Sequence, residues 1–375
     1  MRKTFYSLGV MITVLALLAA AYLISGHSVG AKAQASCQAT SFSQDGNPNL
    51  TAAMVVTTST TISATAVNGN GCDIGIYIQP GLTVTITNSE VFGSTYDGIV
   101  NDGSTVTVSN SRIHDIGDNP LDGVQYGYGI FFSDAHHSKG KITGNVIWNY
   151  QKNGIVVRGV GSSATISKNT VLGQGPVNYI AQNGIELGAG AKGTISNNIV
   201  QGNSYTGSNG GAASGGILIY GGSCNYAALT IGVHITGNIV VGNDVGLFIS
   251  NIDGDPNNPS SCIPTLTPTK IVMNKNIVSN DGANNTGGYN LEGQCCGYQA
   301  GVSDQGDGDQ ITNNGICGSG YTPVNTPPPY YYAIDVTFTN SPTESGNYSC
   351  LNGSPVSALT RTSVKPHEIH TVASI

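Results

Sequence analysis

The sequence predicts an all-β solenoid, in which short strands wind into coils and each coil stacks on the next. Three observations carry this prediction: a strand motif recurs along most of the chain, a second motif alternates with it, and the composition disfavours helices. Of 375 residues only 9% are charged, and 52 are Gly. Such a composition suits many short strands joined by tight turns.

The first motif has the form [Ile/Val]-[Ser/Thr]-x-[Asn/Ser]-x-[Ile/Val]. It begins at Ile86, Val108, Ile142, Ile166, Ile195, Ile235 and Ile311, and Met273 opens a degenerate copy. The second motif is Gly followed by apolar residues. It reads "GIV" at 98, "GIFF" at 129, "GIVV" at 154, "GIEL" at 184, "GILI" at 216, "GLFI" at 246 and "GYNL" at 288. The strict alternation predicts that each motif contributes its own strands to every coil.

The spacing of the first motif sets the size of one coil. Its shortest interval is 22 residues, from Ile86 to Val108, and longer intervals contain inserted loops. A coil this small cannot bury its apolar side alone, so neighbouring coils must pair their strands in parallel around a core of Ile and Val. We expect each Asn at a bend, where it tolerates left-handed backbone and can bond to the same residue one coil away.

The "TISNNIV…GIEL" pattern resembles the repeats of right-handed parallel β-helix proteins with the pectin-lyase-like fold, over residues 72–317. The resemblance implies an all-β, single-stranded right-handed parallel β-helix of about 8–10 coils. It also implies that a lyase would use Lys or Arg as base, often with calcium, and that a glycosidase would use paired carboxylates. On the expected sheet this chain offers one Arg and a loose set of acids, which matches neither pattern cleanly. The fold hosts many unrelated functions.

The two ends of the chain lie outside the repeats. Residues 1–35 have basic residues, an apolar run and a small-residue cleavage site, as in a secretory signal peptide; an uncleaved membrane anchor is the alternative. Residues 36–71 are expected to cap the first coil. Residues 318–375 contain "TPVNTPPPYYY", which prolines bar from a central strand. We expect this Pro/Tyr-containing tail to pack along the last coils, or to act as a flexible linker to a cell-surface partner.

Net charge and cysteine content limit the possible ligands and the cellular compartment. Without residues 1–35 the chain has 11 basic and 21 acidic residues, so the basic footprint of a nucleic-acid-binding protein is absent. An even number of cysteines in an exported chain indicates disulfides. Sequence does not fix their connectivity, but Cys224–Cys262 and Cys317–Cys350 are candidate pairs. The eight cysteines are Cys37, Cys72, Cys224, Cys262, Cys295, Cys296, Cys317 and Cys350.

Insertions fall in two sets, one before and one after the Gly-apolar strands. The first set lies within 108–129, 166–184 and 195–216, and the second within 216–235, 246–273 and 288–311. In stacked coils, insertions at equivalent corners pile up along one edge. The Gly-apolar strands should therefore form the floor of a groove between two walls, which suits an extended chain as substrate.

Glu186 is the exception on this floor. Alternation along the strand places it outward, and its expected equivalents are Val100, Phe131, Val156, Leu218, Phe248 and Asn290. A Glu among apolar neighbours is a candidate general acid or base, or else a solvated surface residue. Arg158 and Asp134 follow neighbouring strands. Arg158 is a candidate partner of Glu186 or of a substrate carboxylate. Asp134, with His136 and His137 in "SDAHH", is a candidate for proton transfer or metal binding, or else part of a loop turn.

Tyrosines and acidic loops complete the candidate set. Phenol rings offer apolar faces to sugars, so the candidate substrate-binding residues are Tyr126, Tyr128, Tyr179, Tyr205 and Tyr220. The sequence establishes no cofactor, and calcium is the candidate. Two Asp-rich loops have oxygen ligands for it, although Asp also makes turns. The candidate metal ligands are Asp253, Asp255, Asp304, Asp307 and Asp309.

Two function classes fit these observations. The first is a secreted or cell-surface enzyme, a hydrolase, lyase or epimerase, that binds and processes an extracellular polysaccharide. The second is a non-catalytic adhesin, matrix protein or glycan-binding protein. A maturation factor for a metal enzyme is a third, but the chain lacks a Met/His cluster. We expect a monomer whose partner is a polysaccharide or a cell-surface glycan.

Overall fold

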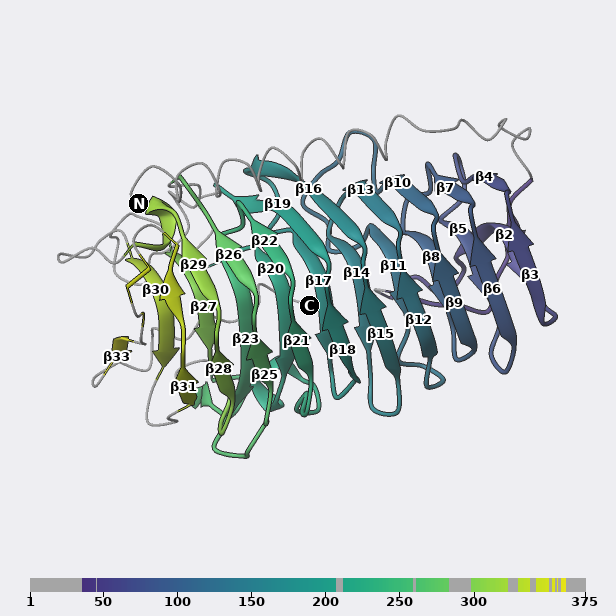
Figure 1. The fold of residues 1–375 in the computed structure, drawn as a ribbon. Helices are drawn as coiled ribbons and strands as arrows, with labels where there is room; N and C mark the ends of the chain where they lie inside the picture. Colours follow the sequence, from purple (N-terminus) through teal and green to yellow (C-terminus); the bar gives the residue numbers. More distant parts are fainter. Residues whose placement is uncertain are drawn as a thin grey trace.

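The computed structural model is a right-handed parallel β-helix made of three long sheets (Figure 1). It describes residues 36–44, 46–206, 212–258, 261–282, 298–322, 330–337, 342–350, 353–354, 356 and 359–361. Each coil contributes one strand to each sheet in turn. The second and third sheets have ten strands each, so ten coils lie within the described ranges, at the upper end of the expected number.

Sheet 1 has thirteen strands and contains the Gly-apolar motif. Its members are parallel, except that β1 and β24 pair antiparallel with β2 and β23. They are β1 Gln38–Ala39, β2 Thr51–Val56, β5 Ile74–Ile78, β8 Asp97–Asn101, β11 Tyr128–Phe132, β14 Asn153–Arg158, β17 Asn183–Gly188, β20 Gly215–Gly221, β23 Val245–Asp253, β24 Ile263–Pro264, β27 Tyr298–Asp304, β30 Tyr330–Thr337 and β33 Leu359–Arg361.

Sheets 2 and 3 share the first motif, which begins in one sheet and ends in the other. Sheet 2 contains β3 Thr60–Ser63, β6 Thr83–Thr87, β9 Thr105–Ser109, β12 Lys139–Thr143, β15 Ser163–Ser167, β18 Lys192–Ser196, β21 His234–Thr236, β25 Val272–Asn274, β28 Gln310–Thr312 and β31 Thr343–Ser345. Sheet 3 contains β4 Ala66–Asn68, β7 Glu90–Phe92, β10 Arg112–Ile116, β13 Val146–Tyr150, β16 Thr170–Val177, β19 Ile199–Tyr205, β22 Ile239–Val241, β26 Ile277–Ser279, β29 Gly315–Cys317 and β32 Tyr348–Ser349. Two short 3-10 helices are η1 Ser223–Asn225 and η3 Ser319–Tyr321.

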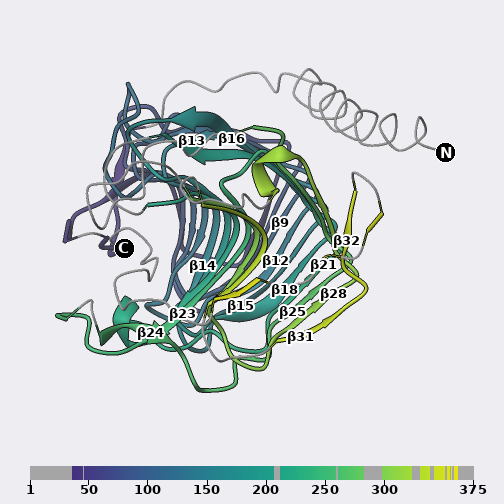
Figure 2. The same ribbon diagram turned by 90° about the vertical axis from the view of Figure 1, so that its left-hand side faces the viewer.

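The core fills the space enclosed by the three sheets, which Figure 2 shows along the stack of coils. The register confirms the predicted alignment, because the first positions of the motif pair directly from coil to coil: Ile62, Ile86, Val108, Ile142, Ile166, Ile195, Ile235, Met273 and Ile311. Almost all of these side chains are fully buried, and each contributes about 1.5–3 kcal/mol of hydrophobic stabilisation.

The glycines of sheet 1 form a column of their own. A Cβ on Gly129 would lie 2.6 Å from the carbonyl oxygen of Gly154, and one on Gly184 would lie 2.7 Å from that of Gly216. A real Cβ does not approach backbone this closely, so the central coils require Gly here, while Ala53 and Ala333 take the same position in the first and last coils. The motif is therefore a consequence of how closely successive coils pass each other.

The asparagines divide between two adjacent positions. Residues such as Asn197, with φ of 55°, take the left-handed bend. The next residue, such as Asn198, is buried and bonds along the stack: its Oδ1 accepts from the Nδ2 of Asn169, and its Nδ2 donates to the Oδ1 of Asn238. The ladder comprises Asn145, Asn169, Asn198, Asn238, Asn276, Asn314 and Asn347. We expected one Asn per coil both to take the left-handed bend and to form the ladder, but two adjacent residues divide these roles.

Coil strands extend on both sides of the expected range of 72–317. At the start, residues 51–68 form β2, β3 and β4, which pair in parallel with the following coil. At the end, β30, β31 and β32 pair in parallel with the preceding coil. Strand β30 begins at Tyr330, directly after the prolines at 327–329, and proline is compatible with the position before a strand.

One motif was assigned to the wrong segment. "GYNL" at 288 lies outside the described residues, and the strand of sheet 1 in that coil is β27. Its Gly301 occupies the glycine column, since a Cβ on Gly246 would meet its carbonyl oxygen at 2.6 Å. The insertion therefore precedes the strand, and the equivalent of Glu186 in this coil is Ser303 rather than Asn290.

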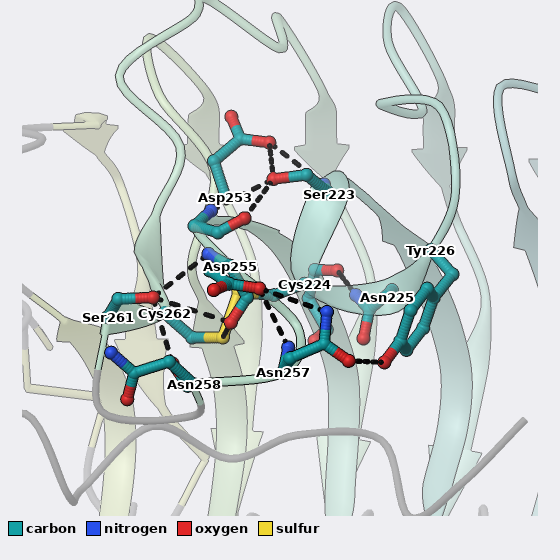
Figure 3. Close-up of a disulfide and its surroundings, with 12 residues drawn as sticks. Ser223, Cys224, Asn225, Tyr226, Asp253, Asp255, Asn257, Asn258, Ser261 and Cys262 are labelled. Atoms are coloured by element: carbon teal, nitrogen blue, oxygen red, sulfur yellow. Dashed lines mark hydrogen bonds between the residues drawn. A yellow bond between two sulfur atoms is a disulfide. The ribbon is translucent and has the colours of Figure 1, made fainter.

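Three disulfides connect neighbouring segments of the described chain: Cys37–Cys72, Cys224–Cys262 and Cys317–Cys350. The last two pairs agree with the expectation. Cys224 and Cys262 join the loops that follow β20 and β23, as Figure 3 shows. Cys295 and Cys296 lie outside the described residues.

Candidate functional site

The outer face of sheet 1 contains the candidate site. Its central row, read from the strand register, contains Tyr77, Val100, Phe131, Val156, Glu186, Leu218, Phe248, Ser303 and Asp335. All nine side chains are buried. Glu186 thus lies among apolar neighbours as predicted, but at 2% exposure it is not part of an open floor.

Glu186 forms a buried ion pair with Arg158 of the preceding coil. The Nε of Arg158 lies 2.7 Å from Glu186 Oε1, and the Arg158 side chain is 13% exposed. The second oxygen, Oε2, accepts a hydrogen bond of 2.6 Å from Asn153 Nδ2. Burial lowers the pKa of Arg158, but the combined attraction of Glu186, Tyr128 and Tyr220 and the hydrogen bond to Glu186 outweigh burial and hold this pKa well above its usual value.

Two of the five candidate tyrosines surround the Arg158 guanidinium. Its central carbon lies 5.4 Å from the ring centroid of Tyr128 and 5.6 Å from that of Tyr220, within cation–π range. Gly188 makes room for the second ring, because a Cβ there would lie 1.8 Å from Tyr220 Cε1. Tyr220 therefore lies over its neighbouring strand, against Arg158.

The other three candidate tyrosines lie elsewhere. Tyr126 stacks on Tyr96, with ring centroids 3.9 Å apart. The hydroxyl of Tyr179 donates to the side chain of Gln174. Tyr205 is buried in a small apolar cluster with two alanines. The geometry therefore gathers only Tyr128 and Tyr220 around the ion pair.

Asparagines at the start of the sheet 1 strands support Glu186, and the sequence analysis missed them. Asn183 Nδ2 donates to Asn153 Oδ1 over 3.0 Å, and Asn183 Oδ1 accepts from the Gly215 amide over 2.9 Å. This chain of hydrogen bonds orients the Asn153 amide toward the carboxylate. The sequence feature that could have revealed these asparagines is the "NG" that opens both "NGIVV" and "NGIEL".

Lys152, also missed, adds a second buried cation. Its ammonium donates to the carbonyl oxygen of Ala181 over 3.0 Å, and its residue is buried. Burial lowers the pKa of Lys152 to about 8, opposed by attraction to Glu186. The site therefore combines one carboxylate with two cationic side chains.

Asp134 and His136 lie at the edge of the same face, after β11. Asp134 is exposed and lies against Gly159, which follows Arg158. His136 Nδ1 lies 3.0 Å from Asp102 Oδ1, and the side chains are 55% and 4% exposed. Asp102 also accepts hydrogen bonds from Ser133 and Tyr77. A buried carboxylate thus binds one ring nitrogen of an exposed imidazole, an arrangement found in histidine acids and bases.

In the first of the two candidate calcium loops, both carboxylates accept hydrogen bonds from neighbouring protein groups (Figure 3). Asp253 accepts from the Ser223 amide and from the Thr265 hydroxyl, at 3.0 and 2.6 Å. Asp255 Oδ1 accepts from the Asn257 amide over 2.9 Å. Asp255 thus makes a turn contact, whereas Asp253 joins its loop to the loop of the preceding coil.

In the second loop, two carboxyl groups face each other inside the solenoid. Asp304 and Asp309 are buried, and Asp309 Oδ1 accepts hydrogen bonds from the Thr269 hydroxyl and the Ile271 amide. Burial raises the pKa of Asp304 to about 6 and that of Asp309 to about 9. The pair therefore holds a proton at neutral pH. Over the described residues, no three His, Cys, Asp or Glu side chains gather as a metal site would require.

Comparison with known proteins supports the fold. Residues 21–171 match the family described as right handed beta helix region. The A-module of the mannuronan C-5 epimerase AlgE6 from Azotobacter vinelandii has a TM-score of 0.52 at 17% identity, over 80% of this chain. This chain spans 65% of that module. No curated protein matches the sequence.

Two further solved structures align less well. The Dettilon tailspike protein gp208 has a TM-score of 0.39 at 15% identity, over 80% of this chain and 58% of its own. The pectate lyase Pel9A has a TM-score of 0.38 at 17% identity, over 78% of this chain and 74% of its own. In the part of the chain that the structure describes, no helix has the length and apolar character of a membrane span.

Proposed function

We propose that this protein is exported, and that it binds an extracellular polysaccharide on the outer face of sheet 1 and processes it there. The observation that carries the proposal is the buried Glu186–Arg158 ion pair, in a row where the other central coils have apolar residues. Removing two charges from water is expensive, and well-packed apolar residues often stabilise a fold as well or better. We therefore infer that the Glu186–Arg158 pair is retained because it has a function.

The surrounding groups suit a sugar polymer. Tyr128 and Tyr220 supply aromatic rings, and Arg158 and Lys152 supply cationic donors for hydroxyl or carboxylate oxygens. The Asp102–His136 pair supplies an exposed imidazole that can transfer protons. A hydrolase, a lyase and an epimerase all need such a proton-transfer group beside a bound chain. The AlgE6 module, whose name gives mannuronan as its polymer, shares the fold and supports only the substrate class, polysaccharide.

The test is a screen of residues 36–375 against plant, algal and bacterial polysaccharides, with and without calcium. Binding, new reducing ends, unsaturated uronates and epimer content are measured together. His136→Ala and Glu186→Gln should each lower turnover at least 100-fold. The exposed Lys192→Ala, on sheet 2, serves as the matched control and should retain full turnover.

His136 is at the surface, so its variant separates loss of chemistry from loss of folding even where Glu186→Gln unfolds. Binding without turnover by the wild-type protein would reject processing and favour the non-catalytic glycan-binding alternative. Absence of binding to every polymer would reject the proposal altogether.

A further inference from the structure

The segments that lead from sheet 1 to sheet 2 form an exposed apolar edge of the solenoid. Single exposed apolar side chains are common on protein surfaces, but within the described residues five of the seven large ones lie in these segments. They are Val160 after β14, Tyr226 and Ile231 after β20, and Ile263 and Leu266 after β23. An exposed apolar group of this kind is typical of an interaction site.

Tyr226 is the most exposed of these side chains, at 76%. Its backbone has φ of 51°, in the left-handed region that disfavours every residue with a Cβ. The Tyr226 amide donates to the carbonyl oxygen of Ser223 over 3.0 Å, and the Cys224–Cys262 disulfide joins this loop to the loop of the next coil (Figure 3). Gly would adopt this conformation without strain, yet the loop holds an aromatic ring in solvent on a rigid support.

Exposed polar groups line the edge of the Tyr226 ring. Its hydroxyl donates to Asn257 Oδ1 of the next coil over 3.4 Å (Figure 3). Asn257 in turn donates to Asp255 Oδ1, from its backbone amide over 2.9 Å and from its side chain over 3.3 Å. A sugar ring has C–H groups on its faces and hydroxyls around its edge, so it complements an aromatic face with an amide and a carboxylate beside it.

The local charge selects among sugars. Residues 222–232 include no charged side chain, and residues 251–258 include Asp253 and Asp255 but no Lys or Arg. A carboxylate beside the ring repels the carboxylate of a uronate, whereas it accepts hydrogen bonds from the hydroxyls of a neutral sugar. The surroundings of Tyr226 therefore favour an uncharged unit.

This edge adjoins the Glu186–Arg158 site. Leu218 on β20 pairs with Glu186 on β17, and Gly222, the residue before η1, lies four positions beyond Leu218. At about 3.3 Å per residue this separation is about 13 Å. A polymer that extends from Glu186 along the strand direction therefore reaches Tyr226.

We propose that Tyr226, with Asn257 and Asp255 at its edge, is a subsite on which an uncharged sugar unit stacks. The rigid loop orders the ring before binding, so little conformational entropy is lost when the sugar arrives. This inference rests on the proposed function, because it assigns a second contact to the same polymer.

The experiment uses residues 36–375 with Tyr226→Gly, Tyr226→Trp and Asp255→Asn. Binding is measured by calorimetry with neutral hexose oligosaccharides and with uronate oligosaccharides of four to eight units. Tyr226→Gly should bind the neutral oligosaccharides about tenfold more weakly, and Tyr226→Trp should restore binding. Asp255→Asn should strengthen uronate binding about threefold, because the repulsion is removed.

Urea unfolding and turnover separate this role from a structural or catalytic one. Tyr226→Gly should unfold at the same urea concentration as the wild type or at a higher one, because Gly suits the backbone and the ring is largely in solvent. Turnover at saturating polymer should be unchanged, since Tyr226 does not reach Glu186. The matched control is Val160→Ser, which removes an exposed apolar side chain without a ring and should leave sugar binding unchanged.

Four results would decide between the alternatives. If Val160→Ser weakens binding as much as Tyr226→Gly, the edge is a general apolar contact surface and the subsite is wrong. If Glu186→Gln abolishes turnover while Tyr226→Gly binds every oligosaccharide like the wild type, the proposed function stands and the subsite is wrong. If the wild type turns over no polymer but its binding depends on Tyr226, the subsite stands and processing is wrong. If the wild type binds no oligosaccharide, both proposals fail.

Discussion

Replacing the Glu186–Arg158 pair by apolar residues distinguishes a functional charge pair from a structural one. Glu186→Leu alone leaves the guanidinium of Arg158, at 13% side-chain exposure, without its carboxylate. Breaking a buried pair in this way costs about 3–5 kcal/mol. The double variant Arg158→Met with Glu186→Leu removes both charges and extends the apolar row of Val156 and Leu218. We expect its stability to lie between equal to the wild type and about 4 kcal/mol above it.

Urea unfolding of the wild type, the two single variants and the double variant forms a complete cycle. Binding of the best polysaccharide is measured on the same four proteins. A double variant that is as stable as the wild type and no longer binds supports a functional pair. A double variant as unstable as Glu186→Leu would refute the reasoning, because the fold itself would then require the charges.

Three further predictions concern the fold around the site. Asn198→Ala removes four side-chain hydrogen bonds and should lower the free energy of unfolding by about 3–5 kcal/mol. The control, Thr194→Ala at an exposed position, should change the free energy of unfolding by less than about 0.5 kcal/mol. Equal effects of the two variants in urea unfolding would contradict a stabilising role of the ladder. Because burial raises the pKa of Asp309 from 3.8 to about 9, the folded protein holds more protons and its stability should fall as pH rises between these values. Asp309→Asn should flatten most of that fall in urea unfolding at pH 5, 7 and 9, and an unchanged slope would exclude this carboxyl. Gly188→Ala places a Cβ into the Tyr220 ring and should cost about 1–3 kcal/mol, with weaker polysaccharide binding; wild-type melting and binding would show that the ring is free to move.

Much of the fold could be predicted because the residues that determine it lie close together in the sequence of each coil. Each coil repeats the same inward Ile or Val and the same glycine, so the first motif marks the register from Ile86 to Ile311. The failures occurred where a loop interrupts the repeat. "GYNL" imitates the glycine motif, while β27 reads "YQAGVSD" and is recognised only by its pairing with β23.

The candidate site was predicted only in part, because its contacts join residues one coil apart. Glu186 and Arg158 stood out as charges on apolar strands. Asp102 and His136 are 34 positions apart, and Asn153 and Glu186 are 33 apart. Loop length varies between coils, so no fixed spacing reveals such pairs. Partners across coils become predictable once the register of sheet 1 is known.

Because of the asparagine ladder, successive coils are joined by the same side-chain hydrogen bond. Each ladder Asn from Asn145 to Asn314 donates its side-chain amide to the Asn of the next coil, and the ladder ends at Asn347. Whole coils can therefore be gained or lost without a new core, and each changes the length of sheet 1 by about 4.8 Å. The length of the outer face can thus change in evolution by one coil at a time, while the end coils stay the same.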